Sequence, residues 1–186
     1  MPAYPDGLLI DKQYLPGMVA TLDNAQIWAY ISGVNAILPF GLGVVRGQTT
    51  EWGALSIPSK VGATGTIVLP SATTDKFEGV LYRSTTYELR DGYTKDANGR
   101  IGYPAKREVS IVRRGVIAVY IDSAVDRGDP VFLRITASGT TGLVGCFRKD
   151  ADTATAIAVP NASFITKATA PTAGQMKVGI IDLRSV

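Results

Sequence analysis

The sequence predicts an all-β protein, and three observations carry that prediction. The apolar segments are short and rich in Val, Ile, Tyr and Thr, which favour strands. The 20 glycines and 10 prolines are scattered among them, so turn residues separate the segments at short intervals. No long stretch repeats its apolar residues with helical spacing. We therefore expect a sandwich or barrel of short, mainly antiparallel strands, with an extended N-terminal arm and a polar hairpin or flap.

The chain divides into an arm and one folded domain. Pro2, Pro5 and Pro16 interrupt the first segment, so residues 1–17 are expected to form an extended arm. Residues 18–186 are then a single β-rich domain of ordinary size. Within it, residues 86–106 are polar and contain the hairpin-turn dipeptides Asp91-Gly92 and Asn98-Gly99, which predict a protruding flap.

The expected strands begin in an uncharged stretch, residues 25–45. Its first part, AQIWAYIS (25–32), alternates aliphatic and aromatic side chains, and a turn follows at Pro39-Phe40-Gly41. Proline, glycines and polar residues interrupt the stretch, so buried strands explain it better than a membrane span. The segments TIVLP (66–70) and FEGVLYRS (77–84) are predicted to be the next strands.

The clearest strand pattern lies in SIVRRGVIAVYIDSAVDRGDPVFLRI, residues 110–135. VIAVYI is apolar on both faces, which is typical of a central strand. Pro130 starts the next strand, where its missing N–H does no harm. ASGTTGLVGCF (137–147) and the closing QMKVGIIDL (175–183) supply further strands.

The composition argues against several chemistries. The chain has no histidine, which removes the usual general base and the commonest metal ligand. The single cysteine, Cys146, sits in an apolar strand pattern and is expected to be a buried, inert thiol. The net charge is +3, and the basic cluster is Lys106, Arg107, Arg113 and Arg114. It is too sparse for a nucleic-acid site, so we interpret it as a solvated face or a patch for an acidic protein partner.

Five groups of residues resemble functional sites, but each has a simpler structural explanation. Arg127-Gly128-Asp129 matches a receptor-binding tripeptide, yet the following Pro130 favours a turn. Lys177 lies near a turn like that of lipoyl or biotinyl carriers, yet it falls inside the final strand pattern. The other groups are a calcium-like loop, a set of acids suited to hydrolysis and an aromatic sugar-binding surface. These comprise Asp91, Asp96 and Asn98; Asp122, Asp126, Asp129, Asp150 and Asp152; and Trp52, Tyr82, Tyr87, Tyr93 and Tyr103. Because turns and packing use the same residues, we predict no catalytic residue, no cofactor and no metal.

Several motifs, taken in order, resemble the structural cement, or capsid decoration, proteins of tailed bacteriophages. The first group is LPGMVATLDNAQIWAYISGVNAILPFGLGVVRG, with its Pro-Gly-Met, Pro-Phe-Gly and Val-Val-Arg-Gly elements. KFEGVLYRS (76–84) is similar to the family's next strand. VSIVRRGVIAVYIDSAVDRGDPVFLRI (109–135) then resembles its Val/Ile-rich strand and Gly-Asp-Pro-Val corner, and ASFITKATAPTAGQMKVGIIDL (162–183) its closing strands.

The resemblance implies a non-enzymatic virion protein. Such a protein binds the outer face of the capsid shell and bridges neighbouring major capsid protein subunits, without nucleic acid or membrane as partners. We expect a homo-oligomer, with a trimer favoured and a dimer as the alternative. The N-terminus lacks the pattern of a secretory signal, so synthesis in the bacterial host cytoplasm is expected. The residues expected to bind the partner are Tyr4, Leu8, Leu9, Ile10, Tyr14, Trp52, Arg113 and Arg114. The alternative function is a carbohydrate- or receptor-binding β module of a phage tail fibre, using Trp52 and the flap tyrosines.

Overall fold

The computed structural model of the chain describes residues 14–47, 66–83, 94–139, 142–172 and 176–184. All regular elements in these ranges are strands, so the all-β prediction is confirmed. They are β1 (Val19–Ser32), β2 (Leu38–Pro39), β3 (Gly43–Arg46), β4 (Thr66–Val68), β5 (Phe77–Leu81), β6 (Gly102–Tyr103), β7 (Glu108–Ile121), β8 (Pro130–Arg134), β9 (Phe147–Arg148), β10 (Ala156–Phe164) and β11 (Lys177–Leu183). No helix long and apolar enough to cross a membrane occurs in the described ranges.

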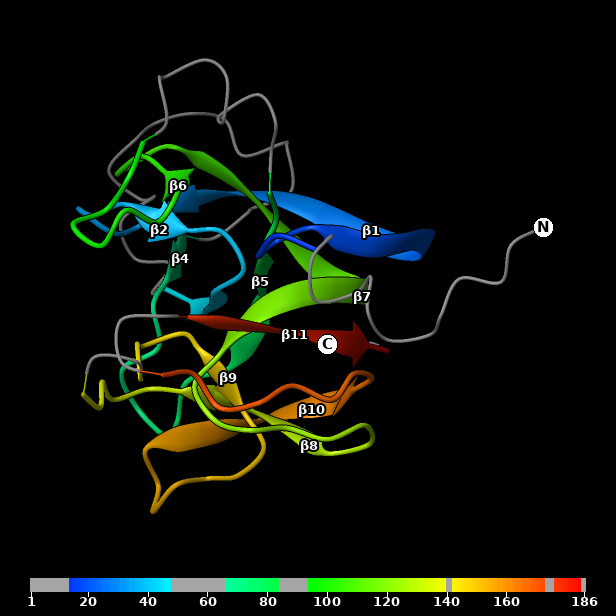
Figure 1. Ribbon diagram of the computed structural model, residues 1–186. Helices are drawn as coiled ribbons and strands as arrows, with labels where there is room; N and C mark the ends of the chain where they lie inside the picture. The colour runs from blue at the N-terminus through cyan, green and yellow to red at the C-terminus, as the bar shows by residue number, and fades with distance from the viewer. Residues whose placement is uncertain (1–13, 48–65, 84–93, 140–141, 173–175, 185–186) are drawn as a thin grey trace.

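The main sheet closes into two rings that share β7. Its nine strands run in the order β1-β4-β3-β5-β7-β11-β10-β8-β9, and β7 also pairs with β1 and with β9. The β1–β7 pairing closes a first ring of β1, β4, β3, β5 and β7. The β7–β9 pairing closes a second ring of β7, β11, β10, β8 and β9. In Figure 1, β1 lies at one end of the molecule and β8 and β10 at the other, with β7 and β11 between them.

Strand β7 belongs to both rings because its two halves have different neighbours. Its first half lies between β1 and β5, whereas its second half lies between the start of β1 and β11 and ends beside β9. Gly115 separates the halves with φ +125°, a conformation that favours glycine. A Cβ at this position would also lie 3.2 Å from the Ala25 Cα, where β1 bulges in its pairing with β7.

The interior consists of two apolar clusters. The larger one fills the second ring, with Ile117, Leu133, Phe147 and Phe164 among its buried members, and extends to β3 and β5. The smaller one joins the first ring to the separate two-stranded sheet of β2 and β6, and includes Leu38, Phe40, Ile111 and Tyr103. The predicted burial of residues 25–45 holds for residues 38–45, which are all buried. It is wrong for residues 26–29, which are exposed because the part of β1 that carries them extends beyond the packed interior.

Two predicted turns are present. Around Asn98-Gly99, Lys95 pairs with Ile101 in an antiparallel bridge, whereas Asp91-Gly92 lies outside the described residues. At Arg127 to Asp129, Gly128 has φ +92° and the Asp129 carboxylate accepts a hydrogen bond of 2.8 Å from the Asp126 N–H. The Gly128 N–H donates to the Phe164 carbonyl at 2.7 Å. The tripeptide is therefore a turn that ties the start of β8 to the end of β10.

Candidate interaction surface

Among the described side chains of β1, the most exposed large apolar residues lie beside two arginines of β7. Ile27 and Trp28 are 43% and 47% exposed, although large apolar side chains are usually buried. Gln26 and Ala29 on either side are also exposed, as is Arg114, and Arg113 is half-buried. We call Gln26–Ala29 together with Arg113 and Arg114 the β1–β7 ribbon.

The register of the two strands brings the exposed apolar residues of β1 beside the arginines of β7. Ile27 is opposite Val112 and Trp28 is opposite Ile111. Since side chains alternate along a strand, Arg113 shares a face with Ile111 and Trp28. The Arg113 guanidinium lies 5.2 Å from the Trp28 ring centroid, within the range of a cation–π contact. Arg114 is opposite Gln26, and a register shift separates this pair from the pair of Ile27 and Val112.

The outer edge of β1 is open along this part of the strand. The Ser32 N–H donates to the Arg107 carbonyl at 2.9 Å, so the backbone groups of Ser32 point towards β7. The direction of the backbone groups alternates along a strand. The N–H and C=O groups of Trp28 and Tyr30 therefore also point towards β7, whereas those of Ile27 and Ala29 point away from it. On that side β4 pairs only with Ile31 and Ser32. Within the described parts of the chain, Ile27 and Ala29 have no strand partner at this edge.

A buried carboxylate, that of Glu78, contacts the ribbon at Arg113. Glu78 of β5 is 4% exposed and accepts hydrogen bonds from the Tyr30 hydroxyl at 2.6 Å and from Arg46 Nη2 at 2.9 Å. Arg113 Nε lies 3.6 Å from the same carboxylate oxygen. Burial raises the pKa of Tyr30, and the hydrogen bond and charge of Glu78 raise it further. The Arg113 that contacts Trp28 is thus fixed on its other side by the core.

The predicted partner-binding residues have different outcomes. Arg113 and Arg114 lie on the ribbon, and Tyr14 is half-buried beside Leu15, which is 50% exposed. The remaining candidates, Tyr4, Leu8, Leu9, Ile10 and Trp52, lie outside the described residues. Ile27 and Trp28 were not among the residues predicted from the sequence to bind a partner. Alternating aliphatic and aromatic residues are equally typical of a sandwiched strand, so the pattern alone did not indicate their exposure.

The predicted acidic set divides into a turn and a buried ion-pair network. Asp122, Asp150 and Asp152 surround the guanidinium groups of Arg134 and Arg148, whereas Asp126 and Asp129 belong to the turn before β8. Arg148 Nη1 lies 2.7 Å from the Asp152 carboxylate and 3.7 Å from that of Asp122, which also contacts Arg134 Nε. Burial raises the pKa of Asp122 to about 6, and the Arg148 guanidinium opposes the shift. With its side chain 1% exposed, Asp122 cannot reach a substrate, and the network serves to join β8 to β9.

Other candidates also have structural uses. Cys146 is buried, and burial raises the pKa of its thiol to about 12, as an inert thiol requires. The Asp96 carboxylate accepts hydrogen bonds from the Asn98 and Arg100 N–H groups and from Arg100 Nε. Tyr103 is fully buried and donates its hydroxyl to the Tyr82 carbonyl, so it cannot contribute to a sugar-binding surface. No cluster of potential metal ligands occurs in the described ranges.

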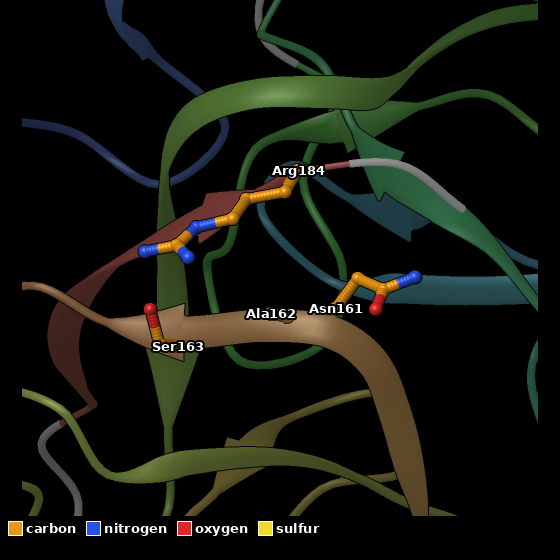
Figure 2. A pocket seen from close by; sticks show the side chains of 4 residues that line it. All are labelled: Asn161, Ala162, Ser163 and Arg184. Atoms are coloured by element: carbon orange, nitrogen blue, oxygen red, sulfur yellow. The ribbon is translucent and has the colours of Figure 1, made fainter.

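A shallow pocket lies between the end of β11 and the middle of β10. Asn161, Ala162, Ser163 and Arg184 line its volume of about 260 Å³. Figure 2 shows the Arg184 side chain extending towards the Ser163 hydroxyl, while the Asn161 amide points away from them. Arg184 Nε is bound to the Asp182 carboxylate at 3.2 Å and its side chain is 73% exposed. These residues supply no nucleophile with an adjacent base, so the pocket has no catalytic arrangement.

A family model described as "Structural cement protein (E217 gp24/Pam3 gp6)" matches residues 11–183, so the chain is a structural protein of the all-β, capsid-associated class. The chain belongs to this family of phage structural cement proteins, which confirms the resemblance found in its motifs. Family membership implies a structural rather than a catalytic role and a location in the virion.

A solved structure of a phage capsid shares the fold over nearly the whole chain. It is a chain of the structure described as "The capsid of Myoviridae Phage XM1", and it superposes with a TM-score of 0.63 at 19% sequence identity. The alignment covers 98% of this chain and 98% of that chain. No curated protein matches the sequence.

Proposed function

We propose that this protein binds the outer face of the assembled phage capsid and bridges neighbouring major capsid protein subunits. The observation that carries the proposal is the β1–β7 ribbon, where Ile27 and Trp28 are exposed beside Arg113 and Arg114. Aromatic residues and arginine are enriched at the centres of protein interfaces, and Trp and Arg are common among residues that dominate binding energy.

Bridging requires contacts to more than one subunit, and the chain offers a second contacting segment. The N-terminal residues Tyr4, Leu8, Leu9, Ile10 and Tyr14 supply apolar side chains within or close to the segment expected to form an extended arm. An arm on one subunit and a ribbon on another give two weak contacts that add through multivalency on a repeating shell. Self-association as a trimer, or alternatively a dimer, would multiply these contacts at a symmetry axis of the shell.

The proposal is tested by adding purified protein to expanded, DNA-filled capsids that lack it. Saturating protein should raise the temperature at which the capsids rupture, because ligand bound only to the intact shell stabilises it by mass action. Rupture is detected by the fluorescence of a DNA-binding dye that stains the released genome. An unchanged rupture temperature at saturation would overturn the proposal.

Two variants separate the contributions of the ribbon and the arm. Deletion of residues 2–13 keeps Tyr14 onwards, including Pro16 and Gly17, which are buried. It should weaken capsid binding without changing the unfolding midpoint of the isolated protein. Trp28→Ala should weaken binding about 30-fold, the effect of a residue contributing about 2 kcal/mol at an interface. Binding of both variants at wild-type affinity would exclude these two segments as the contact.

A further inference from the structure

We propose that the open edge of β1 binds an extended, acidic segment of the major capsid protein as an added strand. This inference rests on the proposed function and specifies the mode of contact and the chemistry of the partner. Strand addition uses main-chain hydrogen bonds for affinity and alternate side chains for specificity.

The backbone of the ribbon supports this mode. Ile27 and Ala29 direct their N–H and C=O groups away from β7, a direction fixed by the hydrogen bond from the Ser32 N–H to the Arg107 carbonyl. Two residues facing outwards offer two donors and two acceptors at spacings that an extended strand matches. Such an open edge is a ready template for pairing with another chain.

The charges around this edge favour an acidic partner. Arg113 and Arg114 lie at the Gln26 end of the ribbon. Beyond its other end, Lys106 donates its ammonium group to the Gly33 carbonyl at 3.0 Å, and Arg107 pairs with Ser32. Among the described side chains of β1 and β7, the exposed Glu108, opposite Ile31, is the one acid, whereas Glu78 of β5 is buried against Tyr30 and Arg46. The edge is therefore flanked by an excess of cations, which would attract carboxylates alternating with apolar residues.

The same charges disfavour a second copy of this chain at the edge. The facing strand would again be residues 26–32 of β1, which contain no acidic residue, so it could not neutralise the flanking cations. An acidic strand from the capsid shell instead neutralises them and covers the exposed Ile27 and Trp28 side chains from either face.

Substitution at Ala29 tests the inference with a matched pair of variants. Ala29→Pro removes the outward N–H, while the hydrogen bonds of Tyr30 and Trp28 with β7 remain available. Ala29→Thr keeps that N–H and fits a strand equally well. Ala29→Pro should lower capsid affinity at least tenfold, whereas Ala29→Thr should change it less than about threefold, since it alters one exposed side chain. Wild-type affinity in Ala29→Pro would overturn the inference.

Hydrogen exchange of the wild-type protein supplies a readout independent of any variant's folding. The amides of Ile27 and Ala29 should exchange rapidly in the free protein and at least tenfold more slowly on capsids. Protection of these amides already in the free protein, at any protein concentration, would mean that the chain or a second copy covers the edge and would overturn the inference. Capsid binding that leaves the Ile27 and Ala29 amides unprotected would also overturn the inference, but it would leave the proposed function intact. No capsid binding by the wild type would overturn both.

Discussion

The two rings of strands are stabilised by different interactions, although both contain β7. Phe147, Leu133 and Phe164 pack in the interior of the second ring. Ion pairs of Arg134 and Arg148 with the Asp152 carboxylate join β8 to β9. The first ring has a smaller cluster, and its strand β1 extends beyond it with both faces exposed at residues 26–29. The difference indicates a division of roles: the second ring contributes mainly stability, and the β1–β7 ribbon contributes mainly contact with a partner.

The largest expected effect comes from removing a buried aromatic side chain from the interior of the second ring of strands. Phe147 is fully buried and packs edge-on against Phe77, with ring centroids 6.1 Å apart. Phe147→Ala should lower the free energy of unfolding by about 4 kcal/mol, because it leaves a cavity as well as losing apolar burial. Urea denaturation followed by circular dichroism measures this loss.

The matched substitution on the ribbon is Trp28→Ala. Trp28 is about half exposed, so its loss should lower the free energy of unfolding by only about 1 kcal/mol. If Trp28→Ala destabilised the isolated protein as much as Phe147→Ala, the ribbon would be part of the core and the division of roles would be wrong.

The next effect concerns the ion-pair network of the second ring. The Arg134 side chain is 4% exposed and contacts the carboxylates of Asp122 and Asp152. Arg134→Ala should cost about 3 kcal/mol of folding free energy near pH 8, because it leaves Asp122 buried without its nearest cation. Arg184→Ala is the control: that side chain is 73% exposed and pairs with Asp182, so its loss should cost no more than about 0.5 kcal/mol.

The cost of Arg134→Ala should depend on pH in a defined direction. The pKa of Asp122 is already raised to about 6 by burial, and removing a neighbouring cation raises it further. A group whose pKa is higher in the folded state stabilises folding as the pH falls through that value. This gain begins at a higher pH in the variant than in the wild type. The stability deficit should therefore narrow between pH 8 and pH 6, and a deficit that widens would contradict the assignment.

Much of the fold was predictable because strand signals are local. The central strand at residues 116–121, the turn before Pro130 and the buried Cys146 follow from short patterns of apolar and turn residues, and the structure has all three. The closed rings were not predictable in detail. Their closure depends on β7 pairing with both β1 and β9, and these partners are distant in sequence.

The candidate surface was predictable only in part. Arg113 and Arg114 were identified as part of the basic cluster with Lys106 and Arg107, for which a solvated face or an acidic protein partner was expected. Ile27 and Trp28 were not, since the exposure of an apolar strand depends on whether another layer covers it. The five acids could not be distinguished in the sequence. In the structure Asp122 is buried in contact with Arg134 and Arg148, residues distant in sequence, whereas Asp126 is exposed.

A smaller effect than that of Arg134→Ala is expected at Glu78, where the core meets the ribbon. Glu78→Gln keeps the shape of the side chain but removes the charge that binds Tyr30, Arg46 and Arg113. It should lower the free energy of unfolding by about 2 kcal/mol, the range for hydrogen bonds to charged groups, whereas the exposed Glu108→Gln should cost under about 0.5 kcal/mol. The charge of Glu78 also contributes to the raised pKa of Tyr30, so ultraviolet titration should find that pKa lower in Glu78→Gln and unchanged in Glu108→Gln. If Glu78→Gln lowered capsid affinity beyond its effect on stability, the position of Arg113 against Trp28 would matter for binding, and the core would help to shape the contact surface.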